Sequence, residues 1–81
     1  MAKAKRLSKL KRLTDGRIIW QVTDVRKLDT GHAVIVGANY PAIDEDILEF
    51  VKEKHPDLDN WFIHEQTGDE ERKQWFWMVT R

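Results

Sequence analysis

The chain has only two prolines, Pro41 and Pro56, and they bracket the one segment whose apolar residues repeat with helical spacing. The apolar positions that share this spacing are Ile43, Ile47, Phe50 and Val51. They fall on one face of a helix because residues three and four apart are neighbours on its surface. A chain with one helix of about three turns must build the rest of its core from other elements. The flanking segments, rich in β-branched and aromatic residues, supply strands.

Charged residues mark both ends of this helix. Asp44, Glu45 and Asp46 stand where the positive end of the helix dipole favours carboxylates, and Lys52 and Lys54 stand at the opposite end. Proline is tolerated in a first helical turn, which suits the proline at position 41. The residue before a proline avoids helical geometry, so the helix ends before residue 55. The sequence therefore predicts a helix over residues 42–54.

Four segments have the composition of β-strands. They cover residues 17–28, 32–39, 61–66 and 73–80. In the first segment the apolar positions alternate through Ile18, Trp20 and Val22, and then the phase shifts to Val25. A β-bulge near Thr23–Asp24 accounts for that shift.

Short turn motifs join these strands. Residues 29–31 (Asp-Thr-Gly) predict a hairpin turn with glycine in the left-handed conformation, and residues 67–71 predict a second turn. The motif Asp15-Gly16 suggests a further hairpin, in which residues 9–13 pair with residues 17–21. A short basic helix is the alternative for residues 9–13, because Leu7 and Leu10 are three apart. The hairpin is favoured because the Asp-Gly turn leads straight into a strand-like segment.

These elements define an α+β fold. We expect an antiparallel sheet of four or five strands with a single helix packed on one face, in the order β-hairpin, helix, β-hairpin. With 81 residues and no cysteine, the chain has room for one small domain without a disulfide scaffold. We expect a basic N-terminal arm over residues 1–12 and the domain over residues 13–81.

The last predicted strand is apolar on both faces. Trp75 and Trp77 point one way, whereas Phe76 and Met78 point the other. A strongly curved sheet would bury both sets of side chains in the core. Alternatively, one set forms an open aromatic face that stacks on bases or takes a partner's side chain. A place at the sheet edge would also let this strand join two copies into a homodimer.

The zero net charge of the chain hides a strong asymmetry. Residues 1–17 carry seven basic side chains and one acidic side chain, whereas residues 18–81 carry seven basic and thirteen acidic side chains. The arm is a solvated tail, a phosphate-binding segment, or a segment that folds back onto the acidic body. The sequence leaves these three alternatives open.

Residues that carry chemistry are scarce. Ser8 is the only serine, there is no cysteine, and the four glycines do not form a phosphate-binding loop. The three histidines are far apart, so we expect no metal site, no cofactor and no enzymatic activity. No apolar segment has the roughly 20 residues of a membrane span, and no signal-like segment follows the charged first residues. The expected location is the cytoplasm.

Two binding hypotheses follow, and the first is preferred. According to the first hypothesis, the chain is a small regulatory or inhibitor-type protein that acts by binding another protein. Accessory proteins of viruses or mobile elements act in this way. An acidic helix face, which would also mimic the phosphates of a nucleic acid, fits a basic groove on the partner. The residues predicted for this site are Asp44, Glu45, Glu49, Glu53, Trp75 and Trp77.

The second hypothesis is a nucleic-acid-binding module. Basic side chains of the arm would neutralise phosphates, and aromatic strand residues would stack on bases. The basic residues predicted for this site are Lys5, Arg6, Lys9, Lys11, Arg12 and Arg17. The acidic body opposes this hypothesis because it repels the phosphate backbone.

Overall fold

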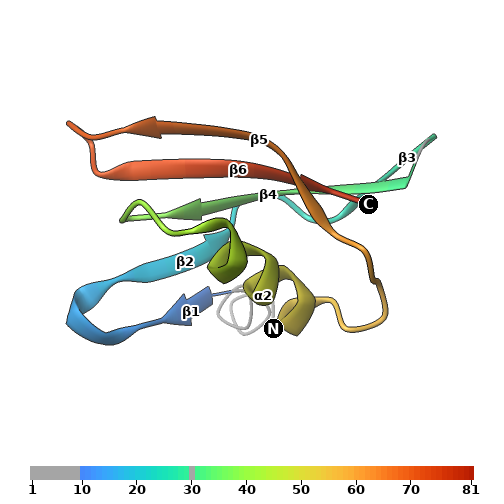
Figure 1. Ribbon diagram of the computed structural model, residues 1–81, viewed down its shortest axis with the longest axis horizontal. Helices are drawn as coiled ribbons and strands as arrows, with labels where there is room; N and C mark the ends of the chain where they lie inside the picture. The colour runs from blue at the N-terminus through green and yellow to red at the C-terminus, as the bar shows by residue number, and fades with distance from the viewer. Residues whose placement is uncertain (1–9, 30) are drawn as a thin grey trace.

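The computed structural model describes residues 10–29 and 31–81. These residues form an antiparallel sheet with one helix packed on one of its faces (Figure 1). The α+β class is confirmed. The elements are β1 (Leu10–Arg12), a 3-10 turn η1 (Thr14–Gly16), β2 (Ile18–Gln21), β3 (Arg26–Leu28), β4 (Gly31–Ala38), α2 (Asp44–Lys54), β5 (Phe62–Asp69) and β6 (Gln74–Thr80). No helix in these residues is long and apolar enough to cross a bilayer.

The long strand β4 occupies the centre of the sheet. The strand order is β1-β2-β4-β6-β5, and β3 pairs with the first part of β4 on the same side as β2. The helix α2 connects β4 to β5, and β6 then returns between these two strands (Figure 1). The last strand, β6, therefore lies inside the sheet. The suggestion from the sequence that it forms an edge strand is wrong. Both backbone edges of β6 are occupied, so it cannot join two copies by strand pairing.

The sheet has six strands, rather than the four or five predicted, because the segment 17–28 is interrupted. Its two halves, β2 and β3, pair with different parts of β4. Between them the N–H of Val22 donates to the carbonyl of Ile35 (2.8 Å), and the N–H of Ile35 donates to the hydroxyl of Thr23 (3.2 Å). The break lies where the apolar pattern of the sequence shifts phase. At this point the hydroxyl of Thr23, rather than a backbone carbonyl, accepts the hydrogen bond from β4.

The N-terminal hairpin is confirmed. Leu10 pairs with Trp20, and Arg12 pairs with Ile18, so the alternative of a helix is wrong for β1. The turn between them has positive φ at Asp15 (62°) and at Gly16 (77°), as the Asp-Gly motif indicated.

Asn39, at the end of β4, holds this hairpin in place. Its side-chain oxygen accepts from the N–H of Ile18 (2.8 Å), and its amide nitrogen donates to the carbonyl of Gly16 (3.0 Å). The side chain thus satisfies two backbone groups at the point where the turn leaves the sheet.

The helix is two residues shorter than predicted. Ile43 is the N-cap, with extended backbone (φ −81°, ψ 157°), so α2 begins at Asp44 and Pro41 precedes it. The three acidic residues of the first turn and the two lysines of the last turn lie where the sequence placed them. His55 leaves helical geometry (φ −134°, ψ 66°), as expected before a proline.

The core lies between α2 and one face of the sheet. The helix contributes Ile47, Phe50 and Val51, each at most 1% exposed. The sheet contributes Ile19, Val34, Val36, Ala38, Trp75, Trp77 and Val79. Trp75 and Trp77, which the sequence offered as binding residues, are 9% and 1% exposed. They fill this core and present no surface to a partner.

Truncating the two neighbouring aromatic residues of β6 should therefore have unequal effects. Trp77→Ala should lower the free energy of unfolding by about 3 to 5 kcal/mol, because a large buried side chain leaves a cavity. Phe76→Ala should cost about 1 to 2 kcal/mol, because Phe76 is only half-buried on the opposite face. Urea unfolding of dilute protein measures both values, and equal losses would contradict this assignment of faces.

Candidate functional site

The face of the sheet opposite α2 carries most of the apolar side chains that remain accessible. The strand registers place on it Trp20, Val22, Leu28, Ile35, Phe62, Phe76 and Met78, a set called here the open face. No described helix or strand lies over it. Of the four large hydrophobic residues exposed in the described residues, three belong to it: Val22 (46%), Leu28 (45%) and Phe62 (53%).

Neighbouring hollows cross the open face and meet at Met78. One, of about 260 Å³, lies between Leu28 and Ile35, and another, of about 340 Å³, extends from Leu28 to Phe62. A third continues along β6 to Phe76. Together they form a broad apolar groove rather than one enclosed pocket. Such a surface takes the side chains of another protein more readily than a buried small molecule.

Gly37 lets the indole of Trp20 lie against the sheet. A Cβ atom on Gly37 would lie 2.7 Å from the Trp20 ring, so only glycine lets the indole lie over the central strand. Trp20 and Phe76 flank Gly37 on the two neighbouring strands. The aromatic part of the open face is therefore pre-formed by the backbone beneath it.

Charges of opposite sign lie on the two flanks of the open face. Arg12 on β1 and Arg26 on β3 are exposed on one flank, and Glu65 and Asp69 on β5 are exposed on the other. Asp69 also caps its own turn, because its carboxylate accepts from the N–H groups of Glu71 (3.1 Å) and Arg72 (3.2 Å). The open face is thus apolar in the middle and bipolar at its rim.

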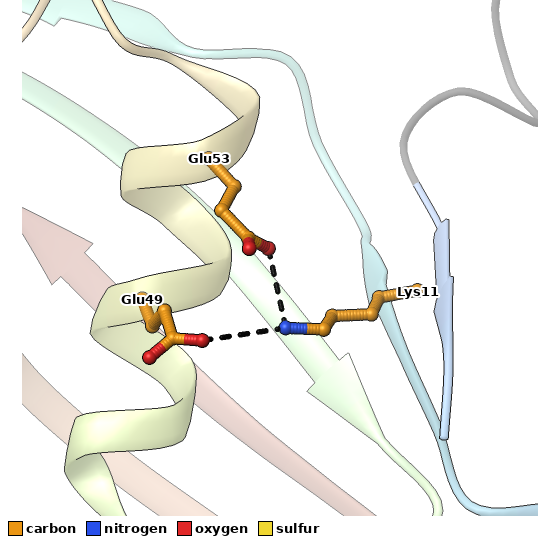
Figure 2. A network of polar contacts seen from close by, with 3 residues as sticks. All are labelled: Lys11, Glu49 and Glu53. Atoms are coloured by element: carbon orange, nitrogen blue, oxygen red, sulfur yellow. Dashed lines mark hydrogen bonds and ion pairs between the residues drawn. The ribbon is translucent and has the colours of Figure 1, made fainter. Parts of the chain in front are cut away.

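The acidic helix face, by contrast, is partly neutralised within the chain. Figure 2 shows the Lys11 side chain reaching from β1 to two helix carboxylates. Its Nζ lies 3.2 Å from an oxygen of Glu53 and 3.6 Å from an oxygen of Glu49. The hydrogen bond to Glu53 raises the pKa of Lys11 above its ordinary value of 10.5. All four predicted acidic residues of α2 are exposed: Asp44 and Glu45 in the first turn, and Glu49 and Glu53 with 67% and 51% of their side chains accessible.

This contact bears on the three alternatives for the basic arm. Lys11 alone among the described basic residues of the arm contacts the acidic helix, which matches the alternative of an arm that folds back. Lys5, Arg6 and Lys9 lie outside the described residues.

The described basic residues of the nucleic-acid hypothesis do not form one surface. Lys11 points to the helix side of the sheet, whereas Arg12 points to the open face. The Arg17 guanidinium lies over the ring of Tyr40, 4.9 Å from its centroid. Burial raises the pKa of Tyr40, whose hydroxyl has no hydrogen-bond partner among the described residues. Lys11 and Arg17 both lie close enough to Tyr40 to oppose this rise of its pKa, whereas Arg12 points to the open face, so the three cations do not form one surface.

The sequence indicated an open aromatic face as one alternative but chose the wrong residues for it. It named the two tryptophans of β6, because large aromatics are the strongest composition signal. The residues that form the face include Trp20, Ile35 and Phe62, which alternate with core residues on three strands. Alternation shows that two faces differ, but only packing of the helix decides which face is covered.

Among residues 10–29 and 31–81, no three His, Asp or Glu side chains converge as a metal site requires. Comparison of the chain with protein-family models, with curated proteins and with solved structures gave no match. The proposal for its function therefore rests on the open face itself.

The Lys11 contact predicts a pH-dependent difference in stability. Lys11→Met should lower the free energy of unfolding by up to about 1 kcal/mol at neutral pH, since the pairs are partly solvated. Because the pKa of Lys11 is raised in the folded protein, its stabilisation is present below pH 10.5 and is lost as the pH rises through the folded value. The two unfolding curves should therefore converge in alkaline solution.

Lys52→Met is the matched control, since Lys52 lies on the same helix as the two glutamates and forms no ion pair within the described residues. Urea unfolding at a series of pH values between neutral and strongly alkaline compares the three proteins. A Lys11→Met deficit that persists unchanged in alkali would show that the pairs do not stabilise the fold.

Proposed function

We propose that this chain is a small regulatory protein that acts by binding another protein, and that the open face is its binding surface. One observation carries the proposal: three of the four exposed large hydrophobic residues in the described part of the chain gather on the sheet face that α2 leaves uncovered. Large contiguous apolar patches are rare on monomeric proteins and mark interaction sites.

The chemistry of the rim supports a protein partner over a nucleic acid. A protein surface supplies acidic groups opposite Arg12 and Arg26 and basic groups opposite Glu65 and Asp69. A row of phosphates would meet the acidic flank on β5 and be repelled by it. The partner we propose therefore has an apolar centre with charges of both signs around it.

The open face also supports the proposal better than the acidic helix does. Lys11 already compensates Glu49 and Glu53, so a basic groove would have to compete with a contact inside the chain. Asp44 and Glu45 lie on the helix side of the molecule, away from the open face. An acidic helix without an adjacent apolar patch offers charge steering but little surface to bury.

Photo-crosslinking tests this proposal. A photoreactive benzoylphenylalanine in place of Phe76, introduced in cells that naturally express the chain, should give a discrete crosslinked product with a second protein. The matched control is the same amino acid in place of Ile43, which is 59% exposed but lies at the start of α2. Crosslinking from Phe76 alone is expected. No product from Phe76, or equal products from both positions, would contradict the proposal.

A titration with nucleic acids tests the rival hypothesis. Mixed-sequence DNA and RNA, single- and double-stranded, should leave the intrinsic tryptophan fluorescence unchanged even at low salt. The reason is that Arg12 points to the face opposite Lys11, Lys11 is paired with two helix carboxylates, and the rim of the open face is partly acidic. Tight binding that weakens steeply with salt would overturn the choice of a protein partner, because such dependence reports phosphate contacts.

A further inference from the structure

We infer that the protein bound by the open face is a second copy of this chain, packed face to face about a two-fold axis that runs along β4. This inference rests on the proposed function, because it names the partner of the same surface. It is drawn from the register of the sheet and from the distribution of charge across it.

The strand order is what makes self-association geometrically matched. With β4 in the centre, β2 and β6 flank it and β1 and β5 lie outside them. A two-fold axis along β4, between two stacked sheets, places β2 of one copy over β6 of the other and β1 over β5. Strands β1 and β5 run in the same direction because each is related to β4 by two antiparallel pairings.

The registers then decide which side chains meet. Trp20 and Phe76 both lie level with Gly37, so the axis brings Trp20 onto Phe76 of the second copy. Val22 and Met78 both lie level with Ile35, so they meet in the same way, and Ile35 meets its own equivalent on the axis. The centre of this interface is apolar throughout and contains an aromatic pair in each half.

The charges become complementary under the same operation. Arg12 comes to lie opposite Asp69 of the second copy, whereas Arg26 lies one strand nearer the axis than Glu65 and two residues along from it. Arg12 and Asp69 each stand two residues beyond the row of Trp20, so they occupy matching positions. A two-fold interface requires a surface that complements itself, and opposite charges on opposite flanks meet that requirement.

The dimensions of the molecule are adequate for such an interface. It extends 35 × 32 Å along its two longer axes, so one face of the molecule has room for the roughly 800 Å² that each partner buries in a stable interface. Two twisted sheets stack about 10 Å apart with their strands about 30° from parallel. The angle between the strands of the two sheets displaces side chains least near the two-fold axis and most at the flanks. At the flanks the long Arg12 side chain can span the offset to Asp69 of the second copy.

Sedimentation analysis of the full chain, with two charge-reversal variants, tests the inference. The wild type should dimerise as its concentration is raised. Arg12→Glu and Asp69→Arg should each raise the dimer dissociation constant about tenfold, because each places like charges opposite one another. A mixture of the two variants should dimerise like the wild type. In the mixed dimer the two substituted side chains face one another with opposite charges, and the unaltered Arg12 and Asp69 form the other pair, so both contacts are attractive.

The mixture separates contacts between copies from effects inside one chain, since a defect within a chain is not rescued by a second defective chain. Lys27→Glu is the matched control, because it makes the same charge change as Arg12→Glu at an exposed position on the opposite face of the sheet. It should leave the dissociation constant unchanged. Asp69→Arg also removes the contacts of Asp69 with its own turn, so urea unfolding of every variant checks that each is folded under the conditions compared.

Three results would overturn the inference: a wild type that stays monomeric, a dimer that resists both charge reversals, and single variants that mixing does not rescue. The crosslinking experiment separates this failure from failure of the proposed function. A Phe76 product of a mass other than two copies, together with a monomeric wild type, would leave the function standing and replace the second copy. Absence of any Phe76 product would overturn both.

Discussion

The structure depends on the fact that one helix of three turns covers only one face of a sheet. Ile47, Phe50 and Val51 of α2 bury the sheet side that carries Trp77 and Val79, and every fully buried large side chain of the described residues belongs to this layer. The opposite side receives no second helix within those residues. The β-branched and aromatic side chains that favour strands alternate between the two faces of the sheet. Those on the face without a helix therefore form an apolar surface. The candidate binding surface is therefore the open face, which the single helix leaves uncovered.

Electrostatics divides the two sides of the sheet in a similar way. On the helix side, Lys11 joins β1 to the carboxylates of α2 and compensates part of an otherwise strongly acidic face. On the open face Arg12 and Arg26 lie on one flank and Glu65 and Asp69 on the other, where Asp69 also pairs with Arg72 of its own turn (3.7 Å). Compensation within the chain reduces the attraction of the helix for a basic partner. The separation of the arginines from the acids on the open face favours a partner with the complementary arrangement, because charges of opposite sign on two flanks orient an approaching molecule.

The sequence predicted the elements better than their roles. The helix and its last residue, the N-terminal hairpin and an irregularity near Thr23 followed from local signals: spacing, an Asp-Gly turn and a shift of phase. The start of the helix was predicted two residues early, and the predicted β-bulge is a break between β2 and β3. The position of β6 inside the sheet did not follow, because strand order is set by contacts distant in sequence. The assignment of Trp75 and Trp77 to a binding surface failed for the same reason. Both faces of β6 are apolar, and only the docking of α2, which the sequence does not orient, made one of them the core.

A sheet that is apolar on both sides has a limited number of stable solutions, and they are layers: a helix, another sheet, or a partner. In this chain the first layer is α2, and the second must come from outside the described elements. A second copy is the economical choice because the register that aligns Trp20 with Phe76 also aligns Arg12 with Asp69. An unrelated partner would have to match both features by coincidence, whereas a two-fold axis along the central strand matches them by symmetry. The dimer would then be a sandwich of two sheets with a helix on each outer side, and the apolar face of each copy would be covered.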